Sequence, residues 1–107
     1  MIHATVTVIA PPGQRERVLE ALRSLLSPTR VEPGCLSCRL CEDVEVLGSF
    51  TLVEEWATPA DFVRRLRSDP YRRLLIIMEH SAEPPEVQFR VVCEVLGIEA
   101  VHVARGR

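Results

Sequence analysis

The chain of 107 residues contains no lysine and no asparagine, so all of its basic side chains apart from histidine are arginine. Positive charge is in slight deficit, because acidic residues outnumber basic ones and the pI is about 5.9. Phosphate binding needs a concentrated positive surface, so this composition argues against a nucleic-acid partner. The chain also lacks an apolar run near the roughly 18 residues of a membrane span, and Met1 leads into an alternating pattern instead of a signal peptide. We therefore expect a cytoplasmic protein without a membrane partner.

No dinucleotide, phosphate or metal motif is present in the sequence, so we expect no cofactor. The spacing C-x-x-C-x-x-C at Cys35, Cys38 and Cys41 superficially resembles a metal site. On a strand, however, Cys35 and Cys41 share one face about 20 Å apart while Cys38 faces the other way. Three thiols placed in this way cannot bind one metal ion. A redox role stays open for Cys35 if it is exposed. Cys93, in an apolar strand, is expected to be a buried hydrophobic residue.

The length predicts a single domain spanning residues 1–107, since a chain of this size can bury a real core. The strongest patterns end near residue 95. We therefore divide the chain into a core of about residues 1–95 and a C-terminal extension of about residues 96–107.

Strand and helix patterns alternate through the first half of the chain. Residues 3–10 alternate between apolar and polar side chains, which predicts a strand. After a Pro-Pro-Gly break, leucines and a valine recur at helical spacing, and the predicted amphipathic helix ends at Pro28. A second strand is predicted over Cys35–Val46, with Leu36, Cys38 and Leu40 facing one way, and Gly48-Ser49 closes a hairpin.

The rest of the chain is organised around residues 50–78, where a strand passes through a capped turn into two short helices. Phe50, Leu52, Glu54 and Trp56 share one strand face. Thr58 is a good N-cap and Pro59 suits the first helical position, so a helix is predicted to begin at Pro59. Trp56, the only tryptophan, ends the strand before this helix, which places it at the rim or floor of a pocket between sheet and helices.

The last third of the chain contains the pattern of one more strand, followed by a tail with two interpretations. Val87, Phe89, Val91, Cys93 and Val95 alternate with polar residues and predict a fourth strand. Residues 98–103 alternate weakly, which suits either a short fifth strand or a tail exchanged with another copy.

The order strand, helix, strand, strand, helices, strand predicts an α+β, ferredoxin-like split β-α-β fold with an antiparallel sheet. Helices cover one sheet face, and no element is left for the other. Because Leu52 with Trp56, or Phe89 with Val91, could place apolar residues on that uncovered face, we expect a second copy to cover it. The predicted partner is thus a homodimer, with the two sheets forming a dimeric α+β barrel.

Several motifs together carry a resemblance to a known family. These are Pro12-Gly13 after the first strand, EPGCLSCRLCED from Glu32, FTLVEEW ending at Trp56, DFVRRLRSDPYRRLL after it, and EPPEVQFRVV before the last strand. Over nearly the whole chain the sequence resembles the antibiotic biosynthesis monooxygenase (ABM) domain. The resemblance implies a small dimeric α+β barrel. It also implies, as in some members, cofactor-independent oxidation of polyphenols or quinols by molecular oxygen, whereas other members have no known activity.

The sequence lacks residues that two groups of family members use. Members often have a histidine just before the leucine of the first of the two helices, where this chain has Arg65 before Leu66. The related haem-degrading members use an asparagine, a tryptophan and a histidine that have no match here, which argues against haem degradation. His80 near a helix end is better explained as a capping residue.

Five residues are candidates for a site. Arg65 flanks the buried helix face and suits either a bound phenolate or carboxylate, or a solvated or Glu-paired role. Glu54 and His3 are candidate catalytic bases, although an Arg-paired Glu54 and an exposed His3 are the simpler alternatives. Trp56 and Phe62 would stack a substrate ring.

Three functions stay open on this basis. In the first alternative, the chain is a cofactor-free monooxygenase, and hence an oxidoreductase, that acts on a small aromatic phenol or quinol. Alternatively, it is a non-catalytic module that binds a small apolar ligand. In the third alternative it is a structural or regulatory dimer whose barrel is filled by its own side chains.

Overall fold

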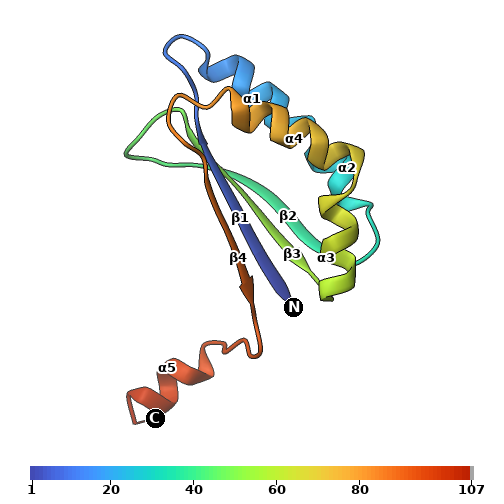
Figure 1. Cartoon of the computed structure of the whole chain (residues 1–107). Coiled ribbons are helices and arrows are strands. Elements are labelled where there is room, and N and C mark those ends of the chain that lie inside the picture. The colour runs from blue at the N-terminus through green and yellow to red at the C-terminus, as the bar shows by residue number, and fades with distance from the viewer. Residues whose placement is uncertain (107) are drawn as a thin grey trace.

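The computed structural model describes residues 1–106, which form one antiparallel sheet, four helices packed on it and a separate C-terminal helix (Figure 1). In chain order, the elements are β1 (Ile2–Ile9), α1 (Arg15–Arg23), α2 (Leu26–Arg30), β2 (Cys35–Glu42), β3 (Ser49–Trp56), α3 (Pro59–Leu66), α4 (Asp69–Glu79), β4 (Glu86–Val91) and α5 (Glu99–Ala104). The strand order is β2-β3-β1-β4, and α1 to α4 lie on one face of the sheet (Figure 1). The α+β, ferredoxin-like fold predicted from the element order is confirmed.

The two central strands follow the predicted alternation. On β1, the side chains of Ile2, Ala4, Val6 and Val8 are buried beneath the helices. On β3, the predicted face of Phe50, Leu52, Glu54 and Trp56 is buried completely, with at most 2% of any of these residues exposed. Burial of this apolar surface, at about 25 cal/mol per Å², is the main term that holds the helices on the sheet.

The predicted start of α3 at Pro59 is confirmed. Thr58 Oγ1 accepts a hydrogen bond from the Asp61 N–H (3.1 Å), and Pro59 occupies the first helical position, where no N–H is needed. Ser68 caps α4 in the same way. At the other end of α4, His80 Nδ1 lies 2.9 Å from the Ile76 carbonyl oxygen, so His80 caps this helix as expected.

Pro28 does not end the first helix, contrary to the sequence prediction. That helix ends at Arg23, and Pro28 lies in the first turn of α2, whose N-cap is Leu25. The first N–H groups of a helix have no partner within the helix, so proline is tolerated there.

β2 differs from its prediction in both length and facing. It ends at Glu42 instead of Val46, and its register shifts between Cys35 and Ser37. This β-bulge inserts an extra residue, Leu36, which is exposed, and it reverses the facing of everything before it. Cys35 and Cys38 consequently share the helix-covered face, and Cys41 faces the other way. The prediction that Cys35 and Cys41 lie on the same face of the strand was therefore wrong.

The last strand is shorter than predicted. It ends at Val91, and Cys93 lies beyond it as an exposed residue instead of a buried one. The segment interpreted as either a short fifth strand or an exchanged tail forms a helix, α5, which stands apart from the sheet and the other helices (Figure 1). The weak alternation there was overridden by helix-forming alanine and glutamate residues that follow Gly97.

The sheet face that the helices leave uncovered is polar, so the prediction that it carries apolar residues was wrong. Leu52 and Trp56 lie on the covered face. Phe89 pairs with Ala4 and Val91 with Ile2, which puts both on the covered side as well. Pairing register alone decides which side of the sheet a residue occupies. The uncovered face instead carries the following side chains: His3, Thr5, Thr7, Ser37, Arg39, Thr51, Val53, Glu55, Gln88 and Arg90.

Across residues 1–106, no helix combines the length and the apolar composition needed to cross a bilayer.

Candidate functional site

A buried ion pair joins β3 to α3. Arg65 Nε donates to Glu54 Oε1 at 2.8 Å, and Arg65 Nη2 donates to Glu54 Oε2 at 3.0 Å. Arg65 is 1% exposed and Glu54 2%, so both charges are removed from water. Two parallel N–H···O bonds fix the guanidinium and carboxylate planes relative to each other. The pair therefore sets the position of α3 over the end of the sheet.

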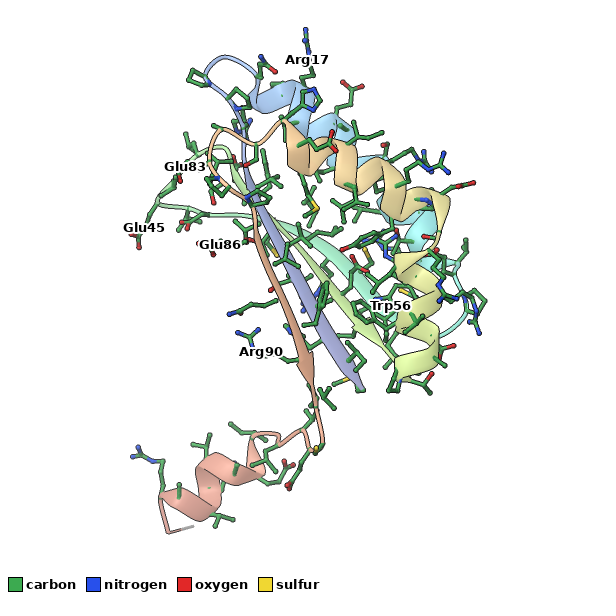
Figure 2. The ribbon with its side chains drawn as sticks, in the orientation of Figure 1. Arg17, Glu45, Trp56, Glu83, Glu86 and Arg90 are labelled. Carbon is green, nitrogen blue, oxygen red and sulfur yellow. The ribbon has the colours of Figure 1, made fainter. Side chains whose placement is uncertain are left out.

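Two aromatic residues enclose the pair. Trp56 Nε1 donates to Glu54 Oε1 at 2.9 Å, so the carboxylate accepts three hydrogen bonds. The guanidinium carbon of Arg65 lies 5.9 Å from the Trp56 ring centroid and 5.0 Å from that of Tyr71. A cation at this range from an aromatic ring is attracted to its face. Figure 2 shows Trp56 between the sheet and α3, and its ring has no exposed surface. We call Glu54, Trp56, Arg65 and Tyr71 the Arg65 cluster.

The turn before β2 is attached to this cluster. Glu32 Oε2 lies 3.5 Å from Arg65 Nη1, opposite the Glu54 pair. Gly34 has φ +81°, and its carbonyl oxygen accepts a hydrogen bond from the Ala57 N–H (2.9 Å). A Cβ built on Gly34 would lie 2.2 Å from Asp61 Cγ and 2.5 Å from its Cβ. The EPG turn thus needs glycine for two reasons, a left-handed backbone and contact with the start of α3.

Replacing Gly34 by alanine is expected to destabilise the protein by roughly 2–4 kcal/mol, combining left-handed strain of about 1 kcal/mol with overpacking of about 1–3 kcal/mol. Gly13→Ala is the matched control, because Gly13 has φ +77° but nothing within 4 Å of its Cβ position. It carries the strain without the clash. Urea unfolding of both variants measures the difference, and equal losses would show that Asp61 moves away without cost.

Burial next to Glu54 changes the acidity of its neighbours. Burial, and secondarily the Glu54 charge, raise the pKa of the Cys38 thiol to about 12. The same two causes raise the pKa of Cys35 and of the Tyr71 hydroxyl above their ordinary values. Thiolate is the reactive form of cysteine, so burial makes both thiols less reactive than an ordinary exposed cysteine. The raised pKa and the partial burial of Cys35 do not favour the redox role considered for it.

The structure brings together four of the five predicted site residues. Phe62 packs with Trp56 in the small apolar cluster at this end of the sheet, beside Glu54 and Arg65. His3 is not part of this group. It faces the uncovered side of the sheet, between Glu55 and Arg90 in the strand register, and Figure 2 shows Arg90 on the side away from the helices. His3 and Glu54 therefore cannot act on one substrate within one chain.

Three further residues of this region were missed from the sequence. Tyr71 and Glu32 complete the surroundings of Arg65, and Phe89 meets Phe62 edge-on with the ring centroids 4.7 Å apart. Tyr71 has a sequence signal, because it lies three residues before the buried Leu74 and hence on the buried face of α4. Glu32 and Phe89 have none, since their contacts depend on how distant segments pair.

Next to the Arg65 cluster, β4 presents partly exposed apolar side chains on the helix-covered face. We call Val87, Phe89 and Val91 the apolar strip; Phe89 is 46% exposed. β4 is an edge strand, so the strip lies at the border of the helical layer. Phe89 joins this strip to Phe62 through the edge-on ring contact. Within residues 1–106, no group of three or more His, Cys, Asp or Glu side chains is placed to hold a metal ion.

Comparison with known proteins places this arrangement in context. The family model described as antibiotic biosynthesis monooxygenase matches residues 1–75. A search of curated protein sequences finds no significant match.

Many solved structures share the fold. A crystal structure of an antibiotic biosynthesis monooxygenase is 25% identical, with TM-score 0.77, and the match covers 88% of this chain and 100% of the other. A Deinococcus radiodurans protein is 20% identical, with TM-score 0.83 and coverage of 92% and 98%. A Pseudomonas aeruginosa protein is 26% identical, with TM-score 0.73 and coverage of 85% and 94%.

Proposed function

Because the chain belongs to the antibiotic biosynthesis monooxygenase family, we propose that it is a monooxygenase that oxidises a small aromatic phenol or quinol with molecular oxygen and no bound cofactor. The structural observation in support is an enclosed arginine–carboxylate pair that Trp56 links to two packed aromatic rings, Phe62 and Phe89. A planar, electron-rich ring fits such an environment, because aromatic rings pack edge-to-face at centroid distances of about 4.5–7 Å.

The proposed chemistry needs a proton acceptor and a site for an anion. Glu54 Oε1 accepts two hydrogen bonds and Oε2 accepts one, so one acceptor position on Oε2 is unused. We assign the phenol proton to this position. Arg65 then exchanges one anionic partner, the carboxylate, for another, the phenolate, so the total charge of the site does not change. Because Arg65 and Trp56 are enclosed, the substrate must displace Phe62 to reach them.

The oxidation itself balances without a further reductant. The phenolate passes an electron to oxygen, and recombination forms a carbon–oxygen bond at the ring. Loss of water then leaves a quinone, so that one oxygen atom enters the product and the other leaves as water. The protein desolvates the ring, orients it and stabilises the anion.

Oxygen uptake with a panel of phenols and quinols tests this proposal. Glu54→Gln keeps the shape of the side chain but removes the base, and we expect kcat to fall about 10²–10⁴-fold. Phe89→Ala should instead raise KM about 2–10-fold through loss of ring packing. Val44→Ala, at a fully exposed loop position, is the control for both. Incorporation of one ¹⁸O atom from labelled oxygen into the product identifies a monooxygenase.

The alternative function is binding of a small apolar ligand without turnover. It is favoured by Arg65, which stands where family members often have histidine and which is fully engaged with Glu54. If phenols raise the melting temperature but no phenol or quinol supports oxygen uptake, this alternative replaces the enzyme.

We also propose that two copies pair through the uncovered sheet faces in a dimeric α+β barrel. This proposal is supported by the family and by the lack of any cover over that face within residues 1–106 (Figure 1). In such a barrel the polar residues of the face, His3 among them, lie between the two sheets.

A further inference from the structure

We propose that the groove between α1 and α4, on the outer surface of the helical layer, binds a free medium-chain fatty acid. The carboxylate lies at one end of the groove and the alkyl chain lies along its floor. None of the residues that line this groove belongs to the Arg65 cluster. The groove is therefore a second small-molecule site, and its occupation does not depend on the function proposed above.

The groove consists of two adjoining hollows of about 230 and 200 Å³. Ala21 of α1 and Ile76 and Ile77 of α4 line both hollows, so the two form one continuous space. The helices lie side by side in opposite directions, because the start of α1 and the end of α4 line the same hollow (Figure 1). Sites for drug-sized ligands usually enclose about 300–1,000 Å³, and the two hollows together fall in the lower part of that range.

The groove exists because α1 presents a small side chain at its centre. Gln14, Arg17, Ala21 and Ser24 line the groove, and their spacing of three or four residues places them on one face of the helix. Ala21 lies in the middle of this row, opposite the two isoleucines. Since its side chain ends at Cβ, the space between the helices stays unfilled.

The floor of the groove is apolar and reaches the surface. Its apolar side chains are those of Val18, Ala21, Leu25, Ile76 and Ile77. Leu25 is buried, but Ile76 is 50% exposed. Removing such apolar surface from water is favourable, so an alkyl chain placed over Ile76 is stabilised there.

Basic side chains lie at both ends of this floor. Arg17 and His80 line the larger of the two hollows and Arg73 lines the smaller, and no acidic residue from the described range 1–106 lines either. Within that range neither Arg17 nor Arg73 has a carboxylate partner. Figure 2 shows Arg17 at the outer surface, on the side of α1 away from the sheet. His80 uses Nδ1 for the Ile76 carbonyl oxygen, which leaves Nε2 for a ligand.

This combination selects an anion with an apolar body. The carboxylate is assigned to the end where Arg17 and His80 converge, because an arginine can donate two parallel hydrogen bonds to a carboxylate. From His80 to Arg73 the axis of α4 advances about 10 Å, at about 1.5 Å per residue. An alkyl chain of medium length spans this distance, and the methylene stem of Arg73 packs against its far end.

Titration of the full chain with decanoate, below the concentration at which it forms micelles, tests where the acid binds. Isoleucine δ1 methyl groups labelled with ¹³C are the reporters. We expect saturable chemical-shift changes at Ile76 and Ile77. Ile2 packs with Trp56 and Phe62, so it reports on the other site and should not shift. The absence of saturable changes at Ile76 and Ile77 would overturn the proposal, whether or not Ile2 responds.

The role of the carboxylate is tested with decanol, which has the same alkyl length and no charge. Decanol should bind at least tenfold more weakly than decanoate. Arg17→Glu should weaken decanoate binding at least tenfold and leave the Kd of decanol within about twofold. Arg23→Glu is the matched control, because Arg23 is an exposed arginine of α1 that does not line the groove. Equal affinities for the acid and the alcohol would contradict the proposal.

Filling the groove tests its role without disturbing the fold. Ala21→Leu places a larger side chain in both hollows, and both residues are strong helix formers. Decanoate should raise the melting temperature of the wild type but not of this variant, because only a bound ligand shifts the folding equilibrium. An unchanged Kd for decanoate in Ala21→Leu would show that the acid binds elsewhere. If Ile76→Glu halves the particle mass in light scattering, the groove is an interface between copies, and the proposal fails.

Discussion

Replacing Arg65 by alanine is expected to lower the free energy of unfolding by about 3–5 kcal/mol, because it leaves the buried Glu54 carboxylate without its cation. Small domains are stable by only about 5–15 kcal/mol, so this loss removes a large part of the total stability of the fold. Urea titration followed by the fluorescence of Trp56, the only tryptophan, measures the loss at the site itself.

The neighbouring residue gives a matched control. Arg64 is also an arginine of α3, but it is exposed, and among residues 1–106 it pairs with Asp61 alone, one turn away. Arg64→Ala should therefore change stability by no more than about 0.5 kcal/mol. A second variant separates charge from packing. Combining Arg65→Met with Glu54→Leu removes both charges and should be markedly more stable than Arg65→Ala. If the double variant is no better, the loss comes from packing and not from the unpaired carboxylate.

Replacing Trp56 by alanine should cost at least about 3–5 kcal/mol, the usual range for a large aromatic side chain removed from a core. Trp56 has no exposed surface, and its indole N–H is one of the three donors to Glu54. The variant therefore combines a cavity with a weakened hydrogen-bond network. Calorimetric unfolding measures the sum.

Trp56→Phe divides these two contributions. Phenylalanine fills most of the space but removes the donor, and loss of one hydrogen bond to a buried charged group costs about 1–3 kcal/mol. Phe89→Ala is the comparison at a half-exposed aromatic, where a loss near 1 kcal/mol is expected. A loss for Trp56→Ala as small as that for Phe89→Ala would mean that the surrounding residues collapse into the space.

Local signals in the sequence were sufficient for the fold. Strict alternation identified β1 and the buried face of β3, and the Thr58-Pro59 pair located the start of α3, because these features depend on neighbours in the chain. The β2 bulge had no such signal. One extra residue at Leu36 changes the facing of Cys35, and a pattern with period two cannot show where an insertion falls.

The sequence identified four residues that the structure brings together, but it misplaced His3, missed Tyr71, Glu32 and Phe89, and did not predict the geometry. Strand alternation and helical spacing place Glu54, Trp56, Phe62 and Arg65 on facing surfaces of β3 and α3. The pairing of Arg65 with Glu54 was one of two alternatives, since helical spacing shows which face a residue occupies and not which atom it meets. The side of the sheet on which His3 lies depends on long-range register. The same limit explains why the apolar strip was assigned to the wrong face.

The central position of β1 also has a consequence for how the chain folds. β2 and β3 form a hairpin from adjacent segments, but β1 must pair with β4, and the Met1–Val92 contact closes a separation of 91 residues. Contacts of such high sequence separation form late, because their loop-closure entropy is not offset until the rest of the structure is in place. During synthesis, β1 therefore keeps one edge unpaired until β4 leaves the ribosome. We expect that interval to be when a nascent chain is most prone to pair with a neighbouring one.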